Sequence, residues 1–265
     1  MLAYRGFRID DPMSRPRLEV PDGCVHLVLG FCEPVSVGRV GDTDEAATPF
    51  VSMVSGLQQK PGLGSHGGRI EGIEVALAPW AALGLFRTTM HELTDAYVAV
   101  EQLSRPWIGR LASRLASRSS WDERFAALDT ALADEFADWR ATSEIRHAWA
   151  LLLRRDGAVT STELARATGW SVRRLQERFR DEVGLRPKAV SRILRLQRVL
   201  RSLDAGTSLS CIAQDSGYSD QSHLNKDFRL LAGCTPTEFM RGRSTVRPGP
   251  PLGRALGQFN SSQLL

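Results

Sequence analysis

Two groups of polar side chains lie 48 to 49 residues apart in the last part of the chain, and both groups suit contact with nucleic acid. The first group is Arg173, Arg174, Gln176, Glu177 and Arg180, and the second is Gln221, Ser222, His223, Asn225, Lys226 and Arg229. Arginine and lysine pair with guanine in the major groove, glutamine and asparagine pair with adenine, and glutamate accepts from cytosine. These residue types predict contacts with base edges and phosphates.

Apolar residues at a four-residue spacing predict a helix under each group. Leu175 and Phe179 accompany the first group, and Leu224 and Phe228 accompany the second. Residues four apart share one face of a helix, so these pairs are expected to point inward. The polar groups would then lie on the opposite, exposed faces.

The segments around these helices repeat each other. Leu164, Ala165, Gly169, Trp170 and Ser171 recur 48 residues later as Ile212, Ala213, Gly217, Tyr218 and Ser219. Leu175, Phe179, Arg180, Gly184 and Pro187 recur 49 residues later as Leu224, Phe228, Arg229, Gly233 and Pro236. A small alanine allows two helices to approach closely, and a glycine four residues later allows a sharp turn. The repeat therefore predicts two helix-turn-helix units.

The capping residues fit this prediction, but they leave open which residue begins the recognition helix of the second unit. Ser171 can cap the second helix of the first unit, whereas either Ser219 or Asp220 can cap its counterpart. The plain alternative is a pair of helical hairpins with ordinary solvated faces. Charge favours a polyanionic partner, because residues 145–265 carry a net charge of +10 whereas residues 1–144 carry −6.

These residues resemble the DNA-binding domain of the AraC/XylS family of bacterial transcription regulators. The second unit carries the resemblance most closely, through Ile212-Ala213, Gly217-Tyr218-Ser219-Asp220, Leu224, Phe228-Arg229, Gly233-Cys-Thr-Pro236 and Phe239. The first unit matches through Leu164-Ala165, Ser171, Leu175, Phe179 and Gly184-Leu-Arg-Pro187. One departure is that Glu177, Asp181 and Glu182 make the first recognition helix less basic than is common in the family.

The resemblance implies an architecture for residues 145–242. One long helix, Lys188–Leu203 here, would join the two units and place two recognition helices one helical turn of DNA apart. Four arginines at three-residue steps in that helix (Arg192, Arg195, Arg198 and Arg201) would either touch phosphates or form a solvated face. The resemblance also implies promoter DNA and RNA polymerase as partners, a small-molecule effector and a homodimer, and it favours activation over repression.

The front half is expected to be rich in strands. Short apolar runs cover Cys24–Phe31, Val35–Val40, Phe50–Val54 and Ile70–Ala78, with a glycine-rich turn expected over Pro61–Gly68. Such a pattern predicts a small β-barrel or sandwich, and the resemblance implies a cupin-like one. The expected fold class is therefore α+β: a cupin-like β-barrel or sandwich with a helical pair, followed by an all-α domain.

A pair of amphipathic helices is predicted after the strands. Pro79 can open a short helix to Phe86, and Pro106 precedes Trp107, Ile108, Leu111 and Leu115 on one face. Ser120 begins a capping box followed by the stripe Phe125, Leu128, Leu132, Phe136 and Trp139. These stripes would either cover the sheet or meet a second subunit. The aromatic residues Trp80, Phe86, Trp107 and Trp121 would either line a pocket or belong to the core.

The expected domains are a sensor and dimerisation domain over residues 1–142, a DNA-binding domain over 143–243 and a disordered tail over 244–265. In the tail, prolines and glycines from Pro248 onward replace the apolar periodicity.

Other functional classes find little support. The four cysteines are irregularly spaced, so neither a disulfide framework nor a zinc site is indicated, and Cys24, His26 and Cys32 lack a second cluster of ligands. Nucleophile-elbow, phosphate-loop and dinucleotide motifs do not occur, so no enzyme and no cofactor is expected. Without a secretory signal or a long apolar run, a cytoplasmic protein is expected.

The sequence therefore predicts a cytoplasmic, sequence-specific DNA-binding transcription regulator that responds to a small molecule. The rival is a ligand-independent architectural protein that bends DNA. Indifference of DNA binding to metabolites, together with little sequence preference, would indicate the rival.

Overall fold

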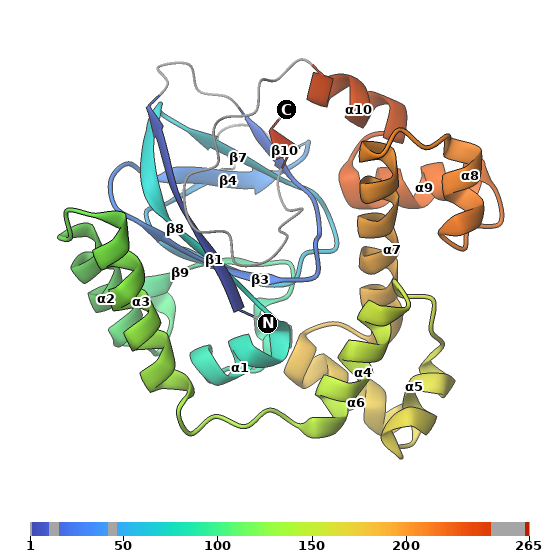
Figure 1. The fold of residues 1–265 in the computed structure, drawn as a ribbon, viewed down its shortest axis with the longest axis horizontal. Coiled ribbons are helices and arrows are strands. Elements are labelled where there is room, and N and C mark those ends of the chain that lie inside the picture. Colours follow the sequence, from blue (N-terminus) through green and yellow to red (C-terminus); the bar gives the residue numbers. More distant parts are fainter. Residues whose placement is uncertain (1, 11–15, 42–46, 245–262, 265) are drawn as a thin grey trace.

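The computed structural model describes residues 2–10, 16–41, 47–244 and 263–264. Figure 1 shows strands on one side of the molecule and the C-terminal helices beside them. The expected α+β class is confirmed. The described strands form two separate five-stranded sheets rather than one closed barrel, so of the two predicted architectures the closed barrel is wrong.

The first sheet has the order β1-β8-β3-β6-β9. Its strands are β1 (Leu2–Asp10), β3 (Val25–Gly30), β6 (Met53–Ser55), β8 (Arg69–Leu77) and β9 (Tyr97–Ala99). All neighbours are antiparallel, with Leu2 and Val25 both opposite Leu77. The expected strand over Phe50–Val54 is instead broken at Val51, because Phe50 ends a strand of the second sheet and Met53 begins β6 of the first.

The second sheet has the order β10-β2-β7-β4-β5. Its strands are β2 (Arg17–Glu19), β4 (Val35–Arg39), β5 (Thr48–Phe50), β7 (Gly62–His66) and β10 (Gln263–Leu264). The glycine-rich segment expected to be a turn is thus the central strand β7. It pairs with β2 on one side and β4 on the other, and these backbone hydrogen bonds outweigh the weak strand propensity of glycine.

One face of the first sheet packs against helices. Val25, Leu27 and Leu29 alternate with less buried residues along β3 and join a core with α1 (Pro79–Phe86), α2 (Pro106–Ala116) and α3 (Trp121–Phe136). Arg124 is 7% exposed, and its guanidinium pairs with Glu71 and lies 4.8 Å from the Trp121 ring centroid. This buried arginine therefore fixes α3 to the sheet.

The apolar stripes of α2 and α3 are internal. Ile108, Leu111, Leu115, Phe125, Leu128 and Leu132 are all buried within the chain. Trp107, Phe136, Trp80 and Trp121 pack partly buried against the same core, and Phe86 is buried in it. Of the alternatives, the stripes cover the sheet and the aromatic residues belong to the core.

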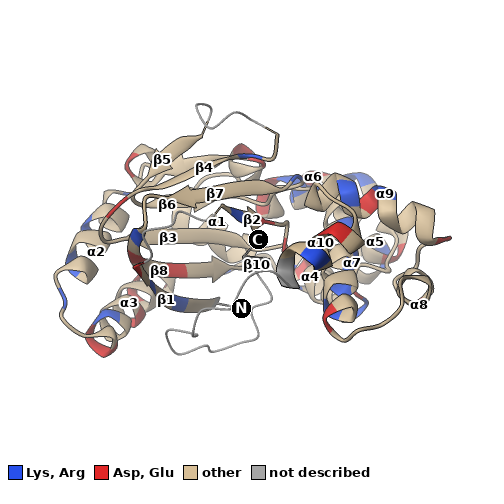
Figure 2. Ribbon diagram, turned by 90° about the horizontal axis from the view of Figure 1, so that it is seen from above, with Lys and Arg blue, Asp and Glu red and all other residues tan. Residues whose placement is uncertain are grey.

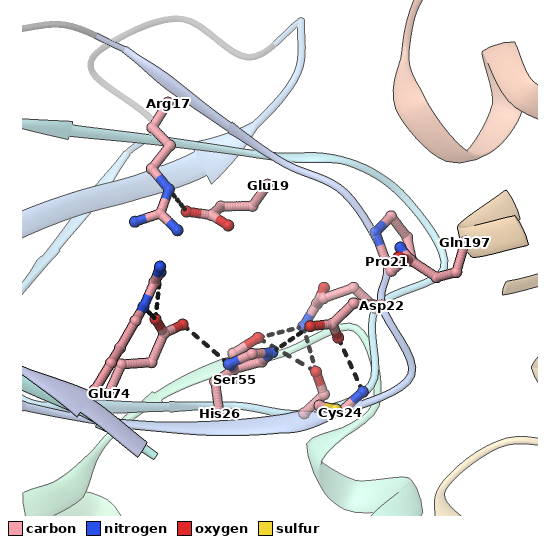
Figure 3. A network of polar contacts seen from close by, with 12 residues as sticks. Arg17, Glu19, Pro21, Asp22, Cys24, His26, Ser55, Glu74 and Gln197 are labelled. Atoms are coloured by element: carbon pink, nitrogen blue, oxygen red, sulfur yellow. Dashed lines mark hydrogen bonds and ion pairs between the residues drawn. The ribbon is translucent and has the colours of Figure 1, made fainter. Parts of the chain in front are cut away.

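The opposite face of the first sheet carries charged side chains toward the second sheet (Figure 3). His26 lies between two carboxylates, with its Nε2 2.9 Å from Asp22 Oδ2 and its Nδ1 3.0 Å from Glu74 Oε1. Glu74 also pairs with Arg5 at 2.6 Å, and Arg17 pairs with Glu19 at 2.8 Å. His26 is therefore held by carboxylates rather than placed with Cys32, which hydrogen-bonds the Arg69 carbonyl.

The His26 cluster gives stability a defined dependence on pH. Burial opposes the charged imidazole, but Asp22 and Glu74 outweigh burial and hold the His26 pKa well above its usual value. The stabilisation is then fully present below a pH of about 6.5, the unfolded value, and is lost as the pH rises through the higher folded pKa. The free energy of unfolding of the wild type relative to His26→Gln should therefore decline above neutral pH. Denaturant titrations of both proteins between pH 5.5 and 9 measure this difference in the free energy of unfolding. A difference that stays constant over this range contradicts a stabilising charged His26.

The C-terminal helices run from residue 143 to residue 244. They are α4 (Ser143–Arg154), α5 (Ser161–Thr168), α6 (Val172–Val183), α7 (Pro187–Asp204), α8 (Leu209–Asp215), α9 (Gln221–Ala232) and α10 (Pro236–Ser244). The predicted long connecting helix is α7, with α6 near one of its ends and α9 beside its other half (Figure 1). The predicted disordered tail lies almost entirely outside the described residues. Within the described ranges, no helix is both apolar and long enough to span a bilayer.

The candidate DNA interface

The first helix-turn-helix unit consists of α5 and α6. Thr160 and Glu163 form the predicted capping box of α5, which ends at Gly169 with a φ of +69°. Only glycine adopts this left-handed conformation freely, so it supports the sharp turn. Ser171 then caps α6, its side chain accepting a hydrogen bond from the Arg174 amide at 3.2 Å.

The second unit, α8 and α9, repeats this geometry. Gly217 makes the turn with a φ of +73°, and the cap of α9 is Asp220, whose carboxylate accepts from the His223 amide at 2.7 Å. This hydrogen bond lowers the Asp220 pKa, so the cap is a carboxylate at the positive end of the helix. Of the two predicted caps, Asp220 is therefore the one used.

The helix caps Ser171 and Asp220 lie 49 residues apart, which defines equivalent positions in the two recognition helices. The inward side chains Leu175, Phe179, Leu224 and Phe228 are at most 1% exposed, as predicted. Nine of the eleven predicted contact residues are exposed on α6 or α9: Arg173, Arg174, Glu177, Arg180, Gln221, Ser222, His223, Lys226 and Arg229. Figure 2 shows the charged residues along these two helices.

The other two predicted residues are Gln176 and Asn225. They occupy equivalent positions, and both are half-buried. The Asn225 Oδ1 atom is buried without a hydrogen-bond partner among the described residues. Less of these two side chains is therefore available to DNA than of their exposed neighbours.

An aromatic residue after each turn positions one contact residue, a role not predicted from the sequence. The Arg174 guanidinium lies 5.0 Å from the Trp170 ring centroid, and the His223 ring meets Tyr218 edge-on at 5.3 Å. Arg174 and His223 are equivalent, each the third residue of its helix. The recurrence of an aromatic side chain after both glycines was the signal available in the sequence.

Two of the three acidic residues that set the first recognition helix α6 apart from the family, Glu177 and Glu182, are paired with arginines. Glu177 pairs with Arg173 one turn away at 2.9 Å, and both side chains are exposed. Glu182 is 4% exposed and pairs with Arg178 at 2.5 Å. Exposed pairs of this kind contribute little to stability, so the Arg173–Glu177 pair can open when DNA approaches.

The arginines of α7 do not form a free basic face. Each of the four forms an ion pair: Arg192 and Arg195 with Asp227, and Arg198 and Arg201 with Asp156. Their side chains are between 22% and 45% exposed, so the ion pairs add internal partners that neither expectation, phosphate contact or a solvated face, included. Their acidic partners are distant in sequence, so the spacing alone gave no sign of them.

Comparison with known families agrees with this geometry. A profile described as a helix-turn-helix domain matches residues 164–242, which span both units and the helix between them. The chain carries an AraC-type DNA-binding domain. The matched domain makes this chain a DNA-binding transcription regulator, as expected from the sequence.

Several solved structures are similar to this chain. ToxT from Vibrio cholerae is 10% identical over 92% of this chain and 99% of its own, with a TM-score of 0.48. A probable AraC family regulator from Rhodopseudomonas palustris is 25% identical over 38% of this chain and 96% of its own, with a TM-score of 0.35. One from Chromobacterium violaceum is 25% identical over 40% and 95%, with a TM-score of 0.37. A comparison with curated proteins found no match.

Proposed function

We propose that this protein recognises a specific promoter sequence by placing α6 and α9 in two successive major-groove segments. The observation that carries this proposal is the equal construction of the two units, each with a capped recognition helix and an exposed polar face. Arg173, Gln221, Ser222 and Lys226 lie in the first two turns and would contact bases. Arg180 and Arg229 lie in the last turn and would hold phosphates.

Selection of bound duplexes from a random pool tests this function. The full chain should enrich one sequence that contains two conserved blocks. The specific duplex should bind about a thousandfold or more tightly than a scrambled duplex at physiological salt. Enrichment of no sequence, with equal affinity for both duplexes, favours the ligand-independent architectural protein.

We propose that a small molecule bound by the strand-rich part controls DNA binding. Support comes from contacts of that part with the first unit and with the connecting helix α7. Thr94 Oγ1 donates to the Gly184 carbonyl at the end of α6, and Gln197 Nε2 of α7 donates to the Pro21 carbonyl at 2.7 Å. Pro21, which contacts α7, directly precedes Asp22, which pairs with His26 in the charged cluster (Figure 3). The net charge of −6 over residues 1–144 favours a neutral or cationic effector.

The Gln197–Pro21 contact should matter for the response rather than for binding the effector. Once thermal-shift screening of the full chain has found a molecule, Gln197→Met should keep the thermal shift and lose most of the change in DNA affinity. Gln58→Met is the control, because Gln58 hydrogen-bonds within the strand-rich part, to Gly56 and Ala96. An unaltered response in Gln197→Met contradicts this route.

We also propose that the protein works as a homodimer with RNA polymerase as a partner and as an activator, as the family resemblance implies. The α2 and α3 stripes are buried, so a dimer must use other surfaces of the strand-rich part. Sedimentation of the full chain at micromolar concentration should give a dimer, and a monomer contradicts it. We place the domain boundary between residues 142 and 143, where α4 begins, and the protein in the cytoplasm.

A further inference from the structure

The four arginines of α7 are divided between two aspartates, one in the turn before the first helix-turn-helix unit and one in the second unit. Asp156 lies between α4 and α5, just before the first unit, and Asp227 is the seventh residue of α9. Arg192 and Arg195 point to Asp227, whereas Arg198 and Arg201 point to Asp156. The second unit and the turn that leads into the first unit therefore each have an ionic attachment to α7, the helix that joins the units.

Asp227 is the more buried of the two, with 9% of its surface exposed. Its Oδ1 accepts from Arg192 Nε at 3.0 Å and Nη2 at 2.5 Å, and its Oδ2 accepts from the Tyr218 hydroxyl at 3.4 Å. Arg195 completes the cluster, with its guanidinium 5.1 Å from the Tyr218 ring centroid. Burial and Asp227 raise the Tyr218 pKa to about 12, so its hydroxyl stays a donor. Removing one partner of such a cluster leaves the others unpaired.

Asp156 is attached through its backbone as well as its side chain. It has a φ of +46° and precedes Gly157, where a side chain would collide with the Ser191 carbonyl of α7. The turn backbone therefore lies directly on α7. The Asp156 carboxylate receives Arg201 Nη2 at 2.6 Å and lies 3.5 Å from Arg198 Nη1.

The equivalent position in the first unit shows that this attachment is not a general feature of the unit. Arg178 of α6 lies 49 residues before Asp227, and it pairs with Glu182 and Thr142 rather than with α7. The aspartates are thus particular to the junction between the units. They also occupy the arginines that could otherwise have bound phosphate.

We infer that Asp156 and Asp227 are positioning residues that fix the angle and separation of the two recognition helices, and so determine which spacing of the two DNA segments the protein accepts. This inference rests on the proposed function, since it requires both helices to occupy DNA. A pair held rigidly pays a large penalty when the segments are moved, because one helix then faces the wrong bases. A loosened pair would tolerate the change.

The test compares the full chain on the selected duplex, on duplexes with one or two base pairs inserted between the segments, and on a duplex with one segment scrambled. The wild type should lose about tenfold or more in affinity on insertion. Asp227→Asn and Asp156→Asn should each reduce that penalty to about threefold or less, while affinity for the single segment stays within about twofold. Asp215→Asn, an exposed aspartate of α8, is the control and should keep the full penalty.

Each other outcome has a definite meaning. An unchanged insertion penalty in both variants overturns the positioning role. An equal loss of affinity on the full site and on the single segment overturns it too, because the aspartates would then serve folding or direct DNA contact. The Asp156 side chain is 35% exposed, so Asp156→Asn still tests the positioning role if Asp227→Asn does not fold. If the wild type itself selects no sequence, the proposed function fails instead. If it selects a sequence but shows no insertion penalty, the positioning role is overturned while the proposed function stands.

Discussion

Replacing Phe228 by alanine should lower the free energy of unfolding by about 3–5 kcal/mol. The variant should therefore unfold at a lower temperature than the wild type and lose DNA binding as it unfolds. Phe228 is 1% exposed and meets Phe239 of α10 edge-on, with ring centroids 5.5 Å apart. Its cluster also contains Leu18 and Val20 from the strand-rich part and Leu196 and Leu200 from α7. A cavity here therefore weakens the second unit and its contact with the front of the chain together.

Leu230→Ala is the matched control, since Leu230 lies two residues further on the same helix and is 52% exposed. It should change the free energy of unfolding by less than about 0.5 kcal/mol. Denaturant titration of both variants measures the difference. Equal effects of the two substitutions would mean that α9 does not bury the face described here.

Replacing Gln221 by alanine should cost about 1–3 kcal/mol of binding free energy on the selected duplex and relax the preference at one base pair. Gln221 is exposed in the first turn of α9, directly after the Asp220 cap, where a recognition helix enters the groove. The expected loss corresponds to roughly a five- to 150-fold weaker complex. Affinity for a scrambled duplex should hardly change.

Arg229→Ala is the comparison for that variant. Arg229 is exposed in the last turn of the same helix, where a phosphate contact is expected. Its removal should weaken binding to both duplexes alike and reduce the salt slope by about one unit. If Gln221→Ala also lost affinity equally on both duplexes, α9 would not contact bases through Gln221, even though the domain assignment would stand.

The two helix-turn-helix units could be predicted from the sequence because their signals are local. The four-residue steps of Leu175 to Phe179 and Leu224 to Phe228, together with the turn glycines, depend only on neighbouring residues. The Asp220 cap was left open between two candidates, since Ser219 has equivalent chemistry. Only the hydrogen bond to the His223 amide separates them.

The rest depends on contacts between distant residues, which the sequence pattern does not contain. β7 was predicted as a turn because it is glycine-rich, yet it is held as a strand by β2 and β4. β1 carries Arg5 and Arg8 three residues apart, without a regular alternation, and becomes a strand through pairs such as Arg5 with Glu74 in β8. The partners of the α7 arginines lie between 32 residues away, for Arg195 and Asp227, and 45 residues away, for Arg201 and Asp156.

Chemical interference mapping of the phosphates and guanines on the selected duplex tests the central claim most directly. Two recognition helices joined by α7 predict two blocks of contacts, centred about 10 base pairs apart on one face of the duplex. Substitutions in α6 should remove contacts from one block, and substitutions in α9 should remove them from the other. A single block, or contacts spread evenly along the duplex whatever its sequence, would contradict recognition by two helices.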